Sequence, residues 1–298
     1  MPMLARPRRS VLYVPGSNAK ALAKARTLPA DALILDLEDS VAPDQKIIAR
    51  DQVAAAVRAR GFGVREVVIR VNGPHTPWGE DDLVAASAAQ PDAILLPKVD
   101  GPGAIMAAAR TLREARAPDA ARIWAMMETP NAILNAGAIA SLAADPSSRL
   151  SVMVMGLNDL AKETRARLTP GRPTMTAWLA TCVLAARAHG VDIVDGVYND
   201  IEDLDGFRAE CLQGRDMGLD GKTLIHPGQI GICNEVFAPT SVEVESAAAI
   251  IAAFALPENA GKGVIQLNGR MVELLHADLA RRTLAIADAI AGRSMAAE

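Results

Sequence analysis

The chain has 298 residues and a mass of 31.3 kDa, which suits either two ordinary domains or one large α/β barrel. Half of its residues are hydrophobic and 22% are charged, a composition that excludes a disordered chain and provides for a sizeable core. A net charge of −4, with only 3% aromatic residues, argues against a nucleic-acid partner.

Eight short apolar runs, rich in β-branched residues, predict eight β-strands. The runs begin at Ser10, Ala32, Glu66, Ala93, Ile123, Leu150, Val191 and Gly221. Alanine-rich stretches that favour helices lie between them, so the runs indicate parallel strands covered on both faces. Eight strands at spacings of roughly 20–40 residues favour a (β/α)8 TIM barrel, with an open doubly wound sheet as the alternative.

The connection after the sixth predicted strand is unusually long. It covers residues 162–176 and contains three arginines, two prolines and a glycine. Loops of this length in compact domains are often lids or binding loops, although a solvated excursion is the simpler alternative. We therefore expect this segment to be a loop at the functional edge of the barrel.

The pattern changes after residue 236, so we expect a barrel domain over residues 1–236 and a C-terminal helical and hairpin extension over residues 237–298. Thr240 and Glu243 have the spacing of a capping box and predict the start of a helix. Asn268-Gly269, between apolar flanks, predicts a two-residue hairpin turn. A last amphipathic helix closes the chain.

Polar and ionisable residues stand near the carboxyl ends of the predicted strands, the edge at which barrel enzymes hold catalytic groups. They are Asp36, Glu38, Asp39, Arg70, Asn72, Lys98, Glu128, Asp159, Asp195 and His226. Strand ends that merely emerge into water would explain two or three of them. His226 could be an acid or base, but we expect it more readily to pack the turn after the eighth strand.

Glu128 and Asp159 follow neighbouring predicted strands, and two carboxylates facing one pocket repel unless a proton or a cation lies between them. The chain has no Cys/His cluster, so oxygen ligands predict a hard ion, Mg²⁺ before Ca²⁺. Such an ion completes its shell with water and substrate oxygens, as a 2-oxo or 2-hydroxy acid would supply. Arg70 is placed to bind a substrate carboxylate in bidentate fashion.

Three cysteines, an odd number without CxxC spacing, indicate neither disulfides nor zinc and favour a cytoplasmic protein. The apolar runs are short and interrupted by charges, so we expect no segment to reach the ~20 residues of a membrane span.

Several motifs, in order along the chain, resemble one enzyme family. They are RSVLYVPGSN, DALILDLEDSVAPDQKIIAR, VIRVNG, LLPKV, METP, MGLNDLA and GLDGKTLIHPGQI. The chain resembles the citrate lyase β-subunit/malyl-CoA lyase family of Mg-dependent acyl-CoA lyases, within the HpcH/HpaI aldolase/citrate lyase superfamily. The resemblance runs from Arg9 to the terminal helix, and the combination of LDLEDSVAP with GKTLIHPGQ is highly specific.

The resemblance implies a barrel with an added C-terminal segment, assembled as a homotrimer or homohexamer. It implies cleavage of a 3-hydroxyacyl-CoA thioester (malyl-, citramalyl- or citryl-CoA type) into acetyl-CoA and a 2-oxo acid. The family's metal ligands fall on Glu128 and Asp159, and its carboxylate-binding arginine falls on Arg70. Glu128 would also meet the substrate through the metal, and Arg70 would help to stabilise the enolate.

Further roles follow from the same resemblance. The CoA-contacting positions fall on Tyr13, Asn18 and Lys24. The family's acid/base carboxylate comes from the C-terminal segment of a neighbouring subunit, and Glu273 stands at that place where an aspartate is common. Asp36, Glu38 and Asp39, near the end of the second strand, would hydrogen-bond to metal-bound waters or to Arg70. Alternatively, one of them is the base that removes the substrate hydroxyl proton, for which Asp36 is a candidate.

Two other functions remain open at this stage. The same scaffold could be a Mg-dependent thioester hydrolase, which would release free CoA instead of acetyl-CoA. It could also be a carrier-dependent citrate lyase β-type subunit that is inactive on free CoA esters.

Overall fold

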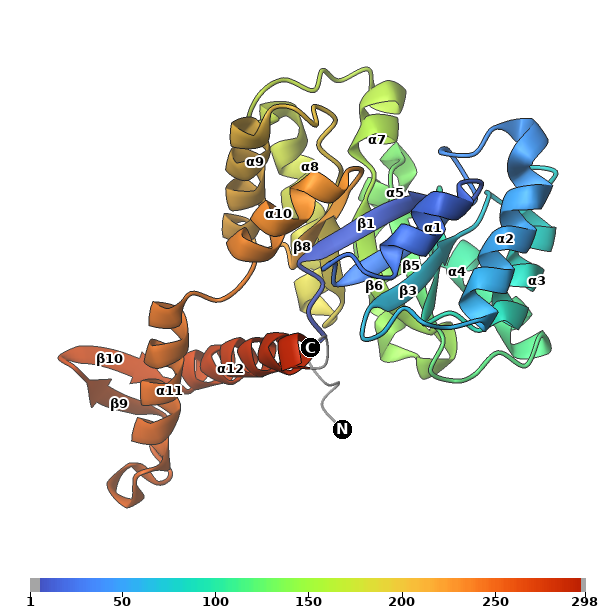
Figure 1. The fold of residues 1–298 in the computed structure, drawn as a ribbon. Helices are drawn as coiled ribbons and strands as arrows, with labels where there is room; N and C mark the ends of the chain where they lie inside the picture. Colours follow the sequence, from blue (N-terminus) through green and yellow to red (C-terminus); the bar gives the residue numbers. More distant parts are fainter. Residues whose placement is uncertain (1–5, 296–298) are drawn as a thin grey trace. The chain divides into compact units, whose positions relative to one another are not determined.

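The computed structural model describes residues 6–295 and divides the chain into two compact units. One unit is Arg8–Phe237, and the other contains, among the described residues, Arg6, Pro7 and Ala238–Met295. Figure 1 shows the order of the helices and strands along the chain.

The first unit is a closed barrel of eight parallel strands in sequence order, which confirms the predicted TIM barrel. The strands are β1 (Ser10–Pro15), β2 (Ala32–Asp36), β3 (Glu66–Arg70), β4 (Ala93–Leu96), β5 (Arg122–Met127), β6 (Leu150–Met155), β7 (Asp192–Asp195) and β8 (Gly221–Leu224). Pairing of β1 with both β2 and β8 closes the ring.

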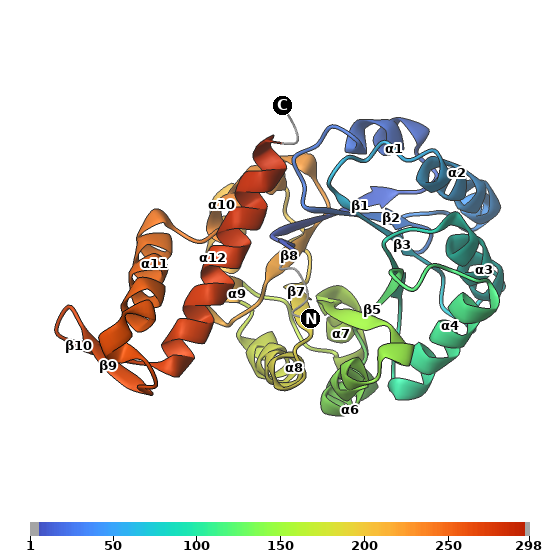
Figure 2. The same ribbon diagram turned by 90° about the horizontal axis from the view of Figure 1, so that it is seen from below.

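Helices surround the strands, as Figure 2 shows. They are α1 (Ala19–Ala25), α2 (Lys46–Arg58), α3 (Gly79–Ala89), α4 (Pro102–Glu114), α5 (Pro130–Leu134), α6 (Ala136–Ser141), α7 (Leu157–Thr164), α8 (Thr176–Ala188), α9 (Leu204–Asp216) and α10 (Ile230–Val236). Short 3-10 helices lie at Pro43–Gln45, Leu142–Ala144, Pro146–Ser148, Pro173–Met175, Pro227–Gln229 and, in the second unit, Pro257–Asn259.

Alternate residues of each strand belong to two different apolar layers. Val11 and Ile34 point into the barrel with the buried Trp124, whereas Leu12 and Leu35 pack outward against the helices. Both layers exclude water, and this is why the strands appear in the sequence as nearly continuous apolar runs. The polar residues that follow the strands are thereby brought to one edge of the barrel.

The second unit consists of two helices and a hairpin. Helix α11 (Ser241–Ala255) begins at the predicted capping box, in which Thr240 and Glu243 hydrogen-bond reciprocally. Strands β9 (Val264–Leu267) and β10 (Arg270–Glu273) pair antiparallel around Asn268-Gly269, whose φ angles of 50° and 76° suit a type I′ turn. Helix α12 (Leu274–Met295) follows directly.

The prediction that no segment is long and apolar enough to span a membrane was wrong by the criteria of length and composition. Pro227–Ala255, 29 residues with a mean hydropathy of 1.4 in its most apolar window, is long and apolar enough by length and composition to cross a bilayer. In the structure this stretch is broken, because α10 ends at Val236 and α11 starts only at Ser241. Pro239 lies in the break and cannot donate a backbone hydrogen bond to a continuous helix.

The predicted loop at residues 162–176 is shorter than expected and is fastened at one end. Helix α7 continues to Thr164, so the irregular part starts at Arg165. Arg172 is buried, and its Nη1 donates to Asp195 Oδ1 at 2.6 Å while its Nε donates to Gln213 Oε1 at 2.9 Å. These bonds hold the end of the loop against β7 and α9.

Candidate active site

A cavity of about 280 Å³ opens at the carboxyl edge of the barrel. Its lining comes from the ends of β1, β2, β3, β5, β6, β7 and β8 and from the segments that follow them. The lining residues are Tyr13, Asp36, Asp39, Ser40, Arg70, Met126, Glu128, Met155, Gly156, Leu157, Asn158, Asp159, Val197, Thr223 and Ile225. Five of the ten strand-end residues predicted from the sequence thus line one pocket.

Arg70 and Asp36 form a buried bidentate ion pair at one side of this pocket. Arg70 Nε and Nη2 donate to the two carboxylate oxygens of Asp36 at 2.6 and 2.7 Å. The register of β2 and β3 sets the two residues directly opposite each other. Because Asp36 also accepts bonds from Glu38 N and from Ser40 N and Oγ, its carboxylate is fully used.

This pairing uses one of the two bidentate edges of the Arg70 guanidinium. The Nε–Nη2 edge is already occupied by Asp36, so a substrate carboxylate cannot take that edge in bidentate fashion. The other edge, formed by Nη1 and the second N–H of Nη2, remains for a substrate carboxylate; its Nη1 lies 2.9 Å from Glu38 Oε2 and 3.1 Å from Asp39 Oδ2. The Tyr13 ring lies against the guanidinium, 4.8 Å from Arg70 Cζ to the ring centroid.

The two buried carboxyl groups beside Arg70 differ in their protonation. Burial alone would raise the pKa of Asp36, but the charge and hydrogen bonds of Arg70 hold that pKa below its usual value. Burial raises the pKa of Glu38 to about 8, and the negative charges of Asp39 and Glu128 add to this effect while Arg70 opposes it. Near neutral pH Glu38 is therefore mostly protonated and becomes a proton acceptor only as the pH approaches 8, whereas Asp36 stays ionised and orients Arg70.

Lys46 supports this side of the pocket and was not found by sequence reasoning. Its buried ammonium donates to Leu37 O, Glu38 O and Asn72 Oδ1 at 2.9, 2.7 and 2.8 Å. Asn72 in turn donates to Leu37 O at 2.8 Å and to Asp82 Oδ2 at 2.6 Å. These bonds tie the segment after β2, which carries Glu38 and Asp39, to the end of β3.

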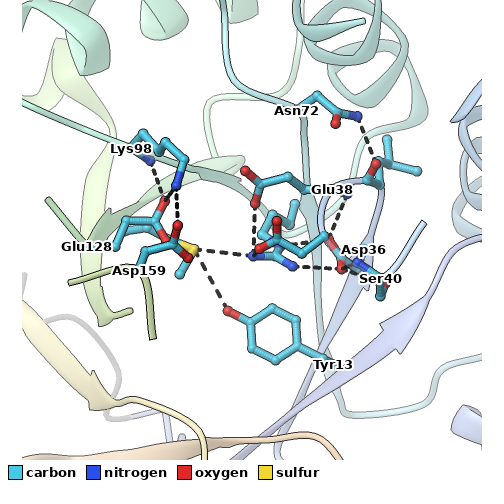
Figure 3. A network of polar contacts seen from close by, with 12 residues as sticks. Tyr13, Asp36, Glu38, Ser40, Asn72, Lys98, Glu128 and Asp159 are labelled. Carbon is cyan, nitrogen blue, oxygen red and sulfur yellow. Dashed lines mark hydrogen bonds and ion pairs between the residues drawn. The ribbon is translucent and has the colours of Figure 1, made fainter. Parts of the chain in front are cut away.

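Glu128 and Asp159 face each other across the other side of the pocket, with the Lys98 ammonium at both carboxylates (Figure 3). Lys98 Nζ donates to Asp159 Oδ1 at 2.6 Å and lies 3.8 Å from Glu128 Oε1. The Lys98 backbone N–H also donates to Glu128 Oε1, at 2.6 Å. Burial raises the pKa of Glu128 to about 7; Lys98 opposes this rise and the charge of Asp159 adds to it.

Gly156 provides the space that Glu128 occupies. A Cβ atom at residue 156 would lie 2.5 Å from Glu128 Cβ and 2.8 Å from its Oε2. Gly156 has a φ of −108°, so it is the contact with Glu128 and not backbone strain that disfavours a side chain there. Asp159 stands one turn further on, in the first turn of α7.

The donor set of Glu128 and Asp159 fits a hard divalent cation. The ammonium of Lys98 already stands in for a cation between the two carboxylates, as the sequence argument required. Among residues 6–295 there is no cluster of three or more His, Cys, Asp or Glu side chains that could hold a metal. A protein that supplies only two carboxylates leaves the other positions to water and substrate oxygens, which is the usual state of Mg²⁺.

Asn18, Lys24 and His226 of the first unit are not among the residues that line the cavity, and Glu273 belongs to the second unit. Lys24 is exposed on α1, and Asn18 caps that helix by accepting a bond from Ala21 N at 3.0 Å. Glu273 is the last residue of β10 in the second unit, where its backbone N–H donates to His276 Nδ1 at 3.0 Å. His226 is exposed and caps the 3-10 helix after β8, with Nδ1 accepting from Gly228 N at 3.1 Å. All three cysteines are free and buried.

Comparisons with known proteins agree with this architecture. The HpcH/HpaI aldolase/citrate lyase family matches residues 9–227. A (3S)-malyl-CoA thioesterase of Cereibacter sphaeroides is 52% identical over 96% of this chain and 97% of its own length. The citrate lyase subunit beta of Escherichia coli is 34% identical over 95% of this chain and 94% of its own.

A solved structure is similar over nearly the whole chain. CitE from Mycobacterium tuberculosis, in complex with magnesium, acetoacetate and coenzyme A, superposes with a TM-score of 0.73 at 28% identity. The match covers 95% of this chain and 98% of that protein. The family match over most of the barrel, and the relatives aligned from end to end, show that the chain belongs to the HpcH/HpaI aldolase/citrate lyase family.

Proposed function

We propose that this chain is a Mg²⁺-dependent thioesterase that hydrolyses a malyl-CoA-type ester to the free hydroxy acid and CoA. The observation that carries this proposal is the arrangement of Glu128, Asp159 and Arg70 around one cavity of about 280 Å³. A pair of cation-binding carboxylates opposite a guanidinium suits a small hydroxy acid. The relative named a (3S)-malyl-CoA thioesterase, at 52% identity, supports hydrolysis over the chemistry of the 34% relatives.

Each side of the pocket would hold a different part of the substrate. Glu128 and Asp159 would hold Mg²⁺, which when bound polarises the oxygens that it contacts as a Lewis acid. Arg70 Nη1 would bind the substrate carboxylate in place of Glu38 or Asp39, while Asp36 keeps the guanidinium in position. The CoA arm would pass Tyr13 and reach the exposed Lys24.

Water is the nucleophile that the pocket allows. The three lining hydroxyls are engaged, because Ser40 Oγ donates to Asp36, Thr223 Oγ1 donates to the carbonyl oxygen of Asp195, and the Tyr13 hydroxyl donates to Met126 Sδ. Glu38 in its ionised form would accept a proton from the attacking water, and with a pKa of about 8 that form becomes more abundant as the pH rises toward 8. The new C–O bond forms, the C–S bond breaks, and the departing CoA sulfur takes up the proton.

Cleavage of the carbon–carbon bond is the second candidate, favoured by the citrate lyase beta subunits that align along the whole chain. In that reaction Glu38 or a neighbouring carboxylate would take the substrate hydroxyl proton, and a 2-oxo acid would leave. Glu273 from a neighbouring subunit of a homotrimer or homohexamer would protonate the enolate of acetyl-CoA. A carrier-dependent beta subunit would perform this reaction only on a carrier-bound substrate.

One product analysis separates these functions. The purified protein is incubated with Mg²⁺ and malyl-, citramalyl- or citryl-CoA, with a chelator control, and thiol, acyl-CoA and acids are quantified. Hydrolysis yields free CoA and intact hydroxy acid in equal amounts. Equal amounts of acetyl-CoA and 2-oxo acid would refute the thioesterase proposal and support the lyase. Inactivity on all three esters would favour the carrier-dependent subunit.

A further inference from the structure

Lys98 holds two positions at once in the carboxylate pair. Its backbone N–H bonds to Glu128 Oε1 at 2.6 Å, and its ammonium bonds to Asp159 Oδ1 at 2.6 Å. The backbone is in the left-handed region, with a φ of 49°, which is uncommon for lysine. Such a conformation persists where the surroundings impose it, and it is frequent at functional sites.

The two contacts of Lys98 differ in how easily they can be broken. The backbone N–H is fixed by the chain between β4 and α4, and its partner Glu128 has a side chain only 1% exposed. The ammonium ends a flexible side chain that is 44% exposed, and Asp159 is 25% exposed. The ammonium can therefore move into solvent while the backbone bond keeps Glu128 in place.

We propose that the Lys98 ammonium is a displaceable occupant of the divalent-cation position, so that it competes with the metal ion while the Lys98 backbone orients Glu128. Without metal, the ammonium offsets the repulsion between Glu128 and Asp159. When a divalent cation binds, the ammonium must leave, because the metal ion and the ammonium group compete for the same position between the two carboxylates. Lys98 thereby lowers the affinity of the empty site for its metal and stabilises the empty site.

The inference rests on the proposed metal site but not on the reaction performed there. Lys98→Met keeps the backbone N–H and much of the side-chain length, and removes the charge. Lys162→Met is the matched control, because Lys162 is an exposed lysine in the last turn of the same helix as Asp159. It makes the same change in net charge without touching the two carboxylates.

The test is calorimetric titration of chelator-treated protein with MgCl₂. Lys98→Met is expected to bind Mg²⁺ at least about fivefold more tightly than wild type, the lower end of typical coupling between linked sites. Lys162→Met should stay within about twofold. Wild-type or weaker Mg²⁺ binding by Lys98→Met, or an equal gain in Lys162→Met, would overturn the proposal.

Thermal unfolding provides a second readout on the same proteins. The metal-free Lys98→Met protein should have a lower Tm than wild type, and a larger rise in Tm on addition of MgCl₂, because a tighter ligand stabilises more. A metal-free Tm equal to or above that of wild type would contradict the stabilising role. If the predicted shifts occur but malyl-CoA is not hydrolysed, the proposed function fails and the role of Lys98 stands.

Discussion

Replacement of Gly156 by alanine should disable the carboxylate pair without unfolding the barrel. The new Cβ would lie 2.5 Å from Glu128 Cβ and 3.0 Å from Met126 Cε, where ordinary contacts are 3.4–4 Å. Met126 Cε ends a flexible side chain and can move away. Glu128 Cβ is attached to its backbone, so restoring an ordinary contact there displaces the Glu128 carboxylate by about 1 Å from the Lys98 N–H. A misplacement of this size costs about 100-fold in rate, equivalent to about 2.7 kcal/mol of transition-state stabilisation.

The assay is kcat and KM for release of CoA from malyl-CoA at several Mg²⁺ concentrations. We expect kcat of Gly156→Ala to fall about 100-fold and the Mg²⁺ requirement to rise, with about 1–3 kcal/mol lost from the free energy of unfolding. Gly137→Ala on α6 is the control, because nothing lies within 4 Å of a Cβ there. A Gly156→Ala protein with wild-type kcat and Mg²⁺ dependence would refute the role of Gly156 in placing Glu128.

Three further variants test other parts of the chain. Glu128→Ala should abolish Mg²⁺-dependent turnover while circular dichroism remains that of a folded barrel; near-normal activity would remove Glu128 from the metal site. Glu273→Gln should leave thioester binding intact and lower kcat, and an unchanged kcat would exclude Glu273 from the reaction. Asp195→Asn should lower stability in urea unfolding at pH 7 by up to about 3 kcal/mol, because the buried Lys222 ammonium and Arg172 guanidinium lose one of two carboxylate partners and keep Glu210. Burial alone would raise the pKa of Asp195, but Lys222 and Arg172 lower it, so its stabilisation should be constant above about pH 5 and be lost as the pH falls below about 4. A wild-type-to-variant difference that grows on acidification would contradict this assignment.

Local patterns predicted much of the secondary structure. The run from Ser10 and the seven runs after it became strands because they carry apolar residues for both faces of a covered sheet. The Asn268-Gly269 turn and the Thr240–Glu243 capping box were predictable since each depends on residues adjacent in the chain. Pro239, which breaks the apolar stretch Pro227–Ala255, is visible in the sequence, but the length and hydropathy of that stretch were underestimated.

Long-range contacts account for what sequence reasoning missed. Nothing in the spacing of Lys46 shows that its ammonium meets the carbonyls of Leu37 and Glu38, because α2 must first fold back on the end of β2. The burial of Arg172 against Asp195 likewise depends on a contact between β7 and a distant loop. A lysine soon after a predicted strand, followed by apolar helix residues, is the one signal that could have drawn attention to Lys46.

The sequence by itself determined the eight strands with helices between them, the helix and hairpin that follow, and the types of side chain at the carboxyl edge, because strand periodicity, caps and turns are local properties. Closure into a barrel depended on the tertiary structure, in which β1 pairs with β8. Only the tertiary structure decided which of these side chains pair. Strand register gives the bidentate edge of Arg70 to Asp36, and the turn after β4 places the Lys98 ammonium at both Glu128 and Asp159. Hydrogen-bond and charge partners depend on distances of a few tenths of an ångström between segments far apart in the chain, and residue order alone does not contain those distances.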